Sequence, residues 1–437
     1  MLLAPALART ATAFGRARRN ALLLRWAPPA PSSASVALRR LSSAPSDDSA
    51  ITDLTDPALG LSPDALAYYE AARAFAAKEM APHAARWDEK HEFPLPTLRA
   101  AAALGFGAMF VDPARGGSGL SRAEAVPVIE ALAAACPSTA AFLTIHNMVL
   151  GMLDKHASDA LRARLMPRLA TMELVASYCL TEPDSGSDAA SLQTRAVRDG
   201  DDFVLTGSKA FISGGGASDV YLVMARTGPA GSTGAAGISA ILVEKGTPGL
   251  SFGKLERKMG WNSQPTRAVF FEGARVPAGN LVGELGQGFK YAMQGLDGGR
   301  LSIAACSVGA AHTAFNLARD HVKVRKQFGK PLAAFQNTQF EIADMASDLY
   351  GARSVVRAAA TLLDAGSPVA RSACANAKRV ATDLGFSVCD RALQLHGGYG
   401  YLQDYPLEKL VRDTRVHRIL EGTNQIMRVI LSRALLE

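Results

Sequence analysis

The sequence predicts an α+β fold in which two helical regions flank a smaller β region. Apolar residues recur at helical spacing from about Ser62 to Met172, and again from about Gly288 to Glu437. Between them, from about Val175 to Leu281, short β-branched and aromatic runs alternate with turns rich in Gly, Asp, Ser and Pro. Helix-length spacers and a G-x-G-x-x-G fingerprint are both missing from this middle region, so a Rossmann fold is disfavoured.

Local signals predict the individual helices and strands. Ser62 and Pro63 form a good N-cap and first helical residue. The β region is expected to form a small antiparallel domain with strands at 203–206, 220–224, 238–243 and 268–271. In the second helical region, one long helix is expected to run to Phe328, because cations, Gly329 and Pro331 mark its end. Further helical patterns cover 337–365, 369–395 and 425–435.

The first 46 residues differ in composition from the rest of the chain. They contain seven arginines, no lysine and no acidic residue. Removing these seven from the 47 Lys and Arg of the chain leaves 40 basic against 40 acidic side chains, so the net charge gives no support for nucleic-acid binding. An Arg-rich, Ser-rich and acid-free segment is typical of a transit peptide, with a disordered basic tail as the alternative. We therefore expect a protein of the mitochondrial matrix.

These composition changes divide the chain into four expected segments. They are a transit peptide at 1–46, an N-terminal helical domain at 47–174, a middle β domain at 175–286 and a C-terminal helical bundle at 287–437. No apolar run reaches the roughly 18 residues that span a bilayer, so no integral membrane segment is expected. The five cysteines are far apart and form no C-x-x-C, so we expect buried or free thiols and no metal site.

Two turn-rich segments of the β region are candidates for ligand binding. Tyr178–Asp188 leads from apolar residues into a turn with hydroxyl groups and exposed backbone N–H groups, which can bind an anion or the polar edge of a planar cofactor. An ordinary turn at the end of a strand would have the same composition. Gly207–Gly216 ends in three consecutive glycines that permit close approach to the backbone, although a loose hairpin connection would explain them equally.

A glycine pair interrupts the long helix expected in the second helical region. Gly298 and Gly299 lie between Asp297 and Arg300. Each glycine costs a helix about 1 kcal/mol relative to Ala, so something should offset the loss. Either a ligand packed against the helix or a tight contact between helices would do so.

Two segments nearer the C-terminus contain a histidine and a carboxylate. Gln394–Gly400 is expected to be a flexible loop after a helix, and His396 alone is more often packed or solvated than catalytic. Glu421, within Leu420–Gln425, follows an apolar pair that could raise its pKa until it serves as a base. The alternative is a surface Glu before a helix cap. A nucleophile elbow, a P-loop and H-E-x-x-H are missing from the sequence.

Taken together and in order, five segments resemble the acyl-CoA dehydrogenase family. They are Tyr178–Asp188, Gly207–Gly216, Arg325–Gly329, Gln394–Gly398 and Leu420–Gln425, and the resemblance runs from about Leu61 to the C-terminus. It implies an N-terminal helical domain, a middle β-barrel and a C-terminal four-helix bundle. It also implies a homotetramer with one FAD per subunit, an acyl-CoA substrate, and electron-transferring flavoprotein as the electron acceptor.

The resemblance also implies roles for individual residues. Glu421 matches the base that removes the α-proton while hydride leaves the β-carbon for flavin N5. One subgroup, the isovaleryl-type enzymes, carries its base where Gly299 stands here, and glycine cannot act as a base. The positions that match acyl-CoA contacts are Ser187, Asp297, Gly298, Gly299, Arg300 and Arg433. The positions that match FAD contacts are Tyr178, Cys179, Leu180, Thr181, Ser185, Gly186, Ser187, Phe211, Ile212, Ser213, Arg325, Phe328, Phe335, Gln336, Gln394, Leu395, His396, Gly397, Gly398, Thr423, Asn424 and Gln425.

Three further segments narrow the expected substrate. Val243–Gly253, Gly260–Arg267 and Gly298–Arg300 are most similar to family members that oxidise isobutyryl-CoA to methacrylyl-CoA in valine breakdown. Another short acyl-CoA, such as 2-methylbutyryl- or butyryl-CoA, is the alternative. An acyl-CoA oxidase is disfavoured, because the N-terminus is transit-like and the C-terminus is not S-K-L-like. A non-catalytic acyl-CoA or flavin-binding scaffold is disfavoured because Glu421 accompanies the full set of flavin segments.

Two residues depart from the usual pattern of the family. Phe211 stands where many members have Trp, which is expected to weaken stacking on the flavin. Asp184, followed by Ser185, replaces the more usual Gly-Ala pair and adds a charge near the expected flavin edge.

Overall fold

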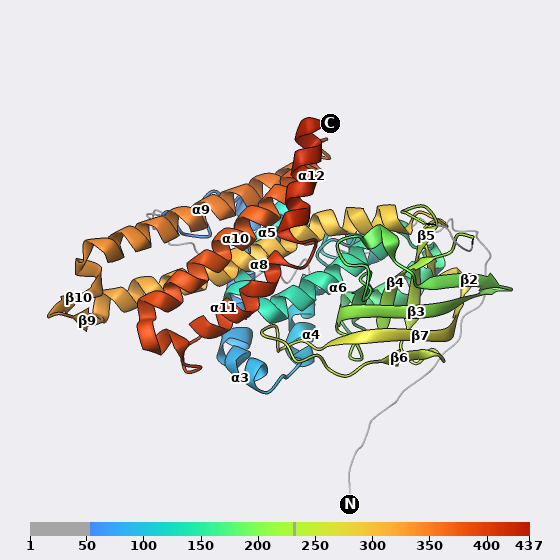
Figure 1. Ribbon diagram of the computed structural model, residues 1–437, viewed down its shortest axis with the longest axis horizontal. Coiled ribbons are helices and arrows are strands. Elements are labelled where there is room, and N and C mark those ends of the chain that lie inside the picture. The colour runs from blue at the N-terminus through green and yellow to red at the C-terminus, as the bar shows by residue number, and fades with distance from the viewer. Residues whose placement is uncertain (1–52, 230–232) are drawn as a thin grey trace, which may run out of the picture. The chain divides into compact units, whose positions relative to one another are not determined.

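The computed structural model describes residues 53–229 and 233–437. The expected transit peptide at 1–46 lies outside these residues. Within them the chain forms helices first, then a β-sheet, then helices again (Figure 1). The order predicted from the sequence is therefore confirmed.

Among the residues from 53 onward that the structure describes, six α-helices precede the sheet, and their ends follow from local capping. Their bounds are α2 Pro63–Phe75, α3 Ala84–Glu89, α4 Leu95–Ala103, α5 Arg122–Ala135, α6 Pro137–His156 and α7 Asp159–Ala170. The hydroxyl of Ser62 accepts a hydrogen bond from the backbone N–H of Ala65, so the predicted N-cap is confirmed. A π-helical turn at Ala76–Met80 and a 3-10 turn at Ala81–His83 connect α2 to α3.

The N-terminus of α5 is capped twice. Ser121 and Glu124 form a reciprocal capping box. In addition, the carboxylate of Asp364, at the end of a helix 242 residues away, accepts the backbone N–H groups of Arg122 at 2.8 Å and Ala123 at 2.9 Å. These bonds satisfy N–H groups that lack partners within α5, and they join the two helical regions.

Eight strands form one mixed sheet. Their bounds are β1 Ala176–Cys179, β2 Arg195–Asp199, β3 Asp202–Ser213, β4 Val220–Arg226, β5 Ile238–Glu244, β6 Leu250–Phe252, β7 Thr266–Pro277 and β8 Leu281–Val282. The strand order is β6-β7-β3-β2-β4-β5-β8, with β1 also paired to β4. All four predicted strands are confirmed, as parts of β3, β4, β5 and β7.

The sheet differs from expectation in two respects. It is not wholly antiparallel, because β1 pairs parallel with β4, in register Ala176 with Val220. The β2–β3 hairpin separates these two strands in sequence and provides the long connection that a parallel pair needs. The expected barrel is not closed, because the edge strands β6 and β8, of three and two residues, pair only with β7 and β5.

Five α-helices follow the sheet. Their bounds are α8 Gly288–Val324, α9 Gln336–Asp364, α10 Ala370–His396, α11 Leu407–Arg415 and α12 Asn424–Leu436. Helices α8, α9 and α10 pack on one another, while α11 and α12 pack on α10 (Figure 1). The expected C-terminal helical bundle is therefore confirmed.

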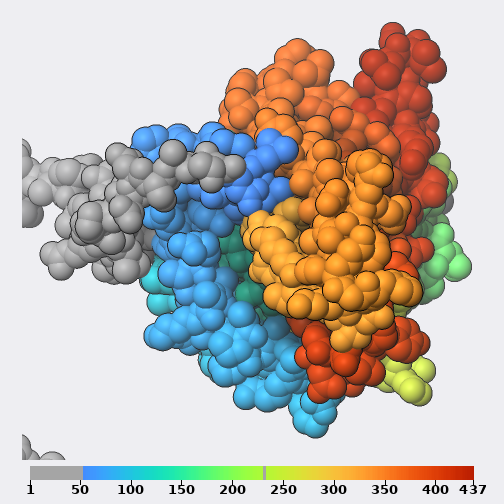
Figure 2. Space-filling view, turned by 90° about the vertical axis from the view of Figure 1, so that its left-hand side faces the viewer, coloured from blue at the N-terminus to red at the C-terminus, as the bar shows by residue number. Residues whose placement is uncertain are grey.

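The long helix α8 ends at Val324, so the prediction that it reaches Phe328 is wrong. Two short strands, β9 Lys326–Gln327 and β10 Lys330–Pro331, form a hairpin instead (Figure 1). Figure 2 views the protein from this end, with this part of the chain in orange at the front. Its turn residues Phe328 and Gly329 have φ of 50° and 78°. Positive φ at both central residues is typical of the tight turns that match the twist of a hairpin.

One helix in this region was not predicted, and one other expectation is wrong. Helix α11 was not predicted, because its nine residues carry many charges and few apolar side chains. Gln394–Gly400 is not a flexible loop. Gln394 and His396 belong to the last turn of α10, and Gly397–Tyr401 forms a 3-10 helix, which a run of three glycines and two tyrosines did not indicate.

Helix α8 lies at the centre of the core and contacts helices from both helical regions. Among the described residues it is the one helix long and apolar enough to cross a membrane, but 78% of its apolar window is buried inside the protein. That burial is typical of a core helix. All five cysteines are free and buried, as expected.

Candidate active site around Glu421

Glu421 lies in a tight turn between a 3-10 helix at Val416–Arg418 and helix α12. Its backbone φ of 55° is left-handed, which few non-glycine residues adopt. Its Oε2 atom is buried and has no hydrogen-bond partner in the described part of the chain. Burial raises the pKa of Glu421 to about 7, although Arg300 and Lys378 nearby act in the opposite direction. The carboxylate therefore has the buried setting that suits a base near neutral pH.

Gly299 of α8 leaves room for this carboxylate. A Cβ atom at position 299 would lie 2.5 Å from Oε2 of Glu421, which is closer than two such atoms can approach. At Gly298, a Cβ atom would lie 2.6 Å from the guanidinium of Arg122, which stacks on the ring of Phe110. A side chain at either position would therefore displace the carboxylate of Glu421 or the guanidinium of Arg122 from its present place.

Arg300 and Asp297 lie on the same stretch of α8. The guanidinium of the buried Arg300 donates to Oδ1 of Asp297 at 2.5 Å. Burial lowers the pKa of Arg300 and raises that of Asp297, and the attraction between the two groups opposes both changes. Nε of Arg300 and the hydroxyl of Tyr178 are also buried without a partner among the residues described. Buried polar atoms are nearly always hydrogen-bonded, so unpaired atoms from three segments are typical of a ligand site.

The segment that contains Tyr178 is held rigidly. After β1, the backbones of Glu182 and Ser185 pair with each other, and the hydroxyl of Ser185 donates to the carbonyl of Asp188 at 2.6 Å. The carboxylate of Glu182 accepts a hydrogen bond at 2.7 Å from the ammonium of Lys209, which is fully buried. This ion pair anchors the start of the turn, in which Asp184 and Ser187 are exposed.

The structure places the Phe211–Ser213 segment beside this turn. The backbone N–H of Ala210 donates to the carbonyl of Thr181 at 2.9 Å, which joins the end of β3 to the end of β1. The side chain of Phe211 is 72% exposed, and its φ of 58° is left-handed. An exposed aromatic ring held in a strained conformation is typical of a ligand-binding position.

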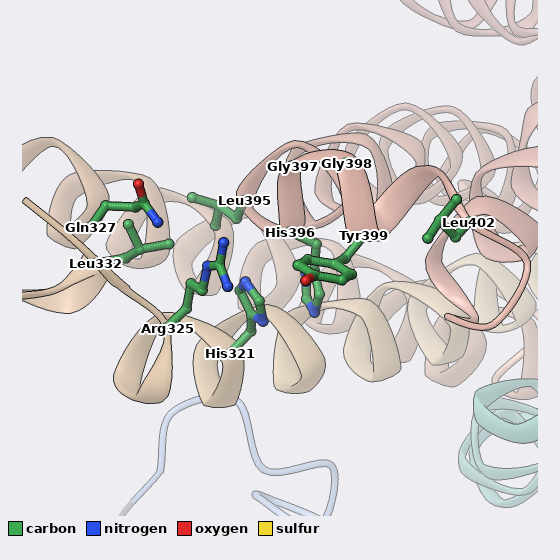
Figure 3. A pocket seen from close by; sticks show the side chains of 10 residues that line it. All are labelled: His321, Arg325, Gln327, Leu332, Leu395, His396, Gly397, Gly398, Tyr399 and Leu402. Atoms are coloured by element: carbon green, nitrogen blue, oxygen red, sulfur yellow. The ribbon is translucent and has the colours of Figure 1, made fainter.

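A second group of predicted residues surrounds a cavity of about 330 Å³. Five residues from the sequence prediction line it, namely Arg325, Leu395, His396, Gly397 and Gly398. Figure 3 shows that the side chains of Arg325, His321 and His396 meet between α8 and the end of α10. The sequence analysis missed His321, Gln327, Leu332, Tyr399 and Leu402 in this lining. His321 lies one helical turn before Arg325, and that spacing could have indicated it.

This cavity is far from Glu421. Along α8, the 24 residues from Arg300 to Val324 span about 36 Å at 1.5 Å per residue. At the same end lie Phe328, 93% exposed on the hairpin, and Phe335, whose rings make an edge contact at 6.2 Å. Gln336 is exposed at the start of α9. One chain therefore does not bring all the predicted residues into one site.

The remaining predicted residues surround Glu421 or lie on the surface. The hydroxyl of Thr423 caps α12, and Asn424 is buried against α10. Gln425, Ser187 and Arg433 are exposed. Their side chains make no hydrogen bond within the described residues.

Three family models match successive parts of the chain. The acyl-CoA dehydrogenase N-terminal domain matches residues 62–173, the middle domain 177–274 and the C-terminal domain 286–436. The chain belongs to the acyl-CoA dehydrogenase family. Members of this family are FAD-dependent oxidoreductases, so the expected enzyme class is confirmed.

Known acyl-CoA dehydrogenases are similar over most of the chain. Mitochondrial isobutyryl-CoA dehydrogenase of Bos taurus is 54% identical over 402 residues, which cover 92% of this chain and 96% of that protein. The enzyme of the same name from Dictyostelium discoideum is 55% identical over 380 residues, with 87% and 91% covered. The structure of butyryl-CoA dehydrogenase from Megasphaera elsdenii matches with a TM-score of 0.83 and 35% identity, covering 86% of this chain and 99% of that one.

Proposed function

We propose that this acyl-CoA dehydrogenase oxidises isobutyryl-CoA to methacrylyl-CoA in the mitochondrial matrix, as a step of valine breakdown. The observation that carries the proposal is the carboxylate of Glu421, whose buried Oε2 atom lies against Gly299 and has no hydrogen-bond partner among the described residues, and whose pKa burial raises to about 7. The substrate and the compartment are supported by more than 50% identity to two mitochondrial isobutyryl-CoA dehydrogenases.

Glu421 accepts the α-proton of the thioester in this proposal. Its backbone N–H makes no hydrogen bond within the described residues, so it is free to donate to the thioester carbonyl as negative charge develops there. One such donor in a dry site is worth roughly 3 kcal/mol of transition-state stabilisation. The acyl chain excludes water when it binds. This strengthens the hydrogen bond from the backbone N–H to the thioester carbonyl and the interaction of the carboxylate with the α-proton.

The cofactor we propose is FAD, whose flavin N5 would supply the acceptor for the hydride of the β-carbon. The residues that would hold it are the exposed Phe211, Tyr178 of strand β1, and Ser185 and Ser187 of the turn that follows this strand. The unpaired hydroxyl of Tyr178 favours a polar ligand at this place. Arg325 and the other predicted residues that line the cavity near the C-terminal end of α8 are too far from Glu421 to hold the same cofactor. We propose that they meet the FAD of another subunit in a homotetramer.

Electrons would then pass from the reduced flavin to electron-transferring flavoprotein, the acceptor that the family resemblance implies. An oxidase would instead pass them to oxygen. Hydrogen peroxide release during turnover in air distinguishes the two. Stoichiometric peroxide would replace the dehydrogenase assignment with that of an oxidase.

An anaerobic titration of the purified mature protein tests the proposal. We expect isobutyryl-CoA to bleach the flavin band at lower concentration than butyryl-, 2-methylbutyryl- or isovaleryl-CoA. Preferential bleaching by one of the others would keep the reaction and change the substrate. A colourless protein, or a flavin that none of the four reduces, would contradict the enzymatic function and support a binding scaffold.

A further inference from the structure

Helix α10 contributes one buried cation to the turn that contains Glu421. Lys378 is fully buried, and its ammonium donates to the carbonyl of Gly422 at 2.8 Å and to Oδ1 of Asn424 at 2.8 Å. A buried ammonium is costly unless it is paired and hydrogen-bonded, and both acceptors here are neutral. The placement of Lys378 therefore serves the turn rather than a direct ion pair.

The backbone of this turn needs such support. Glu421 and Gly422 have consecutive left-handed φ values of 55° and 84°. A left-handed non-glycine residue costs about 1 to 3 kcal/mol and persists only where its surroundings fix it. Lys378 binds the carbonyl directly after Glu421, and Thr382, four residues later on the same helix, hydrogen-bonds to Asn424.

Lys378 also contributes positive charge close to the carboxylate. The charged groups that face its ammonium are Glu421 and Asp383, which favour its protonated form, and Arg300 and Arg418, which oppose it. The groups that face Glu421 are Arg300 and Lys378. Burial lowers the pKa of Lys378 to about 7. An opposite charge within a few ångströms stabilises a carboxylate in its ionised form.

Resting on the proposed role of Glu421 as the base, we propose that Lys378 is a positioning residue. Its two hydrogen bonds hold the Glu421–Asn424 turn, and its positive charge, where it is protonated, favours the ionised form of the carboxylate that accepts the α-proton. It does not touch the substrate or exchange a proton with it.

Two variants of Lys378 separate its hydrogen bonds from its charge. Lys378→Met removes both, whereas Lys378→Gln can still donate to one carbonyl but carries no charge. Lys258→Met is the matched control, since Lys258 also donates to one backbone carbonyl and one side-chain oxygen, those of Gln264 and Thr266, at 2.7 and 2.8 Å. The charged groups near Lys258 are Asp413 and Asp88, not Glu421.

The first readout is the pKa of Glu421 itself, from the infrared band of its protonated carboxyl group. The band is identified by difference from Glu421→Gln and followed with pH in the oxidised holoenzyme. Loss of a nearby positive charge should raise this pKa by about one unit or more in Lys378→Met and Lys378→Gln, and not in Lys258→Met. An unchanged pKa in both Lys378 variants would overturn the proposal.

The second readout is the pH profile of flavin reduction by isobutyryl-CoA. The acidic limb of this profile should move to higher pH by the same amount as the pKa of Glu421. The rate at pH 7 should then fall about tenfold for each unit of that pKa change and recover at higher pH. A uniform loss of rate and flavin in both Lys378 variants, with no shift in the limb, would indicate a merely structural lysine. If the infrared shift occurs but wild type reduces no flavin, the charge effect stands and the proposed function fails.

Discussion

Glu421 must be ionised to accept a proton, and its protonation should govern the pH dependence of the reaction. Burial raises its pKa from 4.5 to about 7, so the active, ionised form is lost as the pH falls through that value. We expect the rate of flavin reduction at saturating substrate to fall about tenfold per unit below about pH 6 and to level off above about pH 8. Anaerobic stopped-flow measurements check this, and a flat profile from pH 5.5 to 8.5 would contradict it.

Replacing the carboxylate of Glu421 by its isosteric amide should remove the base alone. Glu421→Gln keeps the size of the side chain, so the variant should retain its flavin and bind acyl-CoA. Isobutyryl-CoA should then leave the flavin band unbleached, with the reduction rate at least about 100-fold lower. Near-normal reduction in this variant would assign the base to another residue.

Activity should be equally sensitive to a side chain at position 299. In Gly299→Ala, the new methyl group would lie 2.5 Å from Oε2 of Glu421 and force the carboxylate away. A displacement of about 1 Å can lower a rate about 100-fold, so we expect such a loss with flavin content unchanged. Gly351→Ala is the control, because its Cβ atom would meet nothing within 4 Å. Full activity in Gly299→Ala would show that the carboxylate works from another position.

The residues of this site were predictable to different degrees. Glu421 and Gly299 were indicated by a short motif and by an unusual glycine in a helix. Lys378 was not, because it looks like any lysine in a helical pattern, and its role depends on a contact with Gly422, 44 residues later. The same limit applied to Arg122, whose contact with Gly298 joins two distant segments.

Helix α5 illustrates how one element depends on another. Asp364, at the last residue of α9, caps the first backbone N–H groups of α5. We expect Asp364→Ala to lower the free energy of unfolding by about 1 kcal/mol, as other losses of a cap do. Urea denaturation followed by circular dichroism measures this. Asp390→Ala, which removes an exposed carboxylate that makes no hydrogen bond or ion pair within the described residues, should not destabilise the protein, and equal losses in both would contradict the capping role.

At the level of whole elements, the sequence pattern predicted what is local and missed what is distant. The four strands were predictable because alternating apolar runs and turns lie within a few residues. The parallel pairing of β1 with β4 depends on how the 40 residues between the two strands fold, and no local sequence pattern determines that. The end of α8 was misplaced because cations followed by glycine are common both at helix ends and in tight hairpins.

At the scale of the whole molecule, the end of the bundle near the hairpin should be an interface. Phe328 of the hairpin is 93% exposed. Val324 at the end of α8, Phe340 near the start of α9 and Tyr401 in the 3-10 helix after α10 are also exposed. Large exposed apolar side chains gathered in one region are typical of a surface that binds another protein. We therefore expect the wild-type enzyme to sediment as a tetramer.

Phe328→Asp should disrupt that assembly and release flavin. The predicted residues around the cavity near Arg325 would then no longer contact the FAD of the other subunit. Analytical ultracentrifugation and flavin absorbance measure both effects. Val197→Asp, on strand β2, is the control, since Val197 is 54% exposed but far from the hairpin in sequence. A variant Phe328→Asp that remains tetrameric with full flavin would contradict this interface.

The contact between Gly299 and Glu421 restricts how this enzyme can evolve. A Cβ atom at position 299 would lie 2.5 Å from Oε2 of Glu421, so we expect any substitution there to displace the carboxylate and lower activity. A lineage that moved its base from the turn to the helix would therefore have to change both positions together, or pass through an intermediate of low fitness. The two residues, 122 positions apart, should be inherited as a pair.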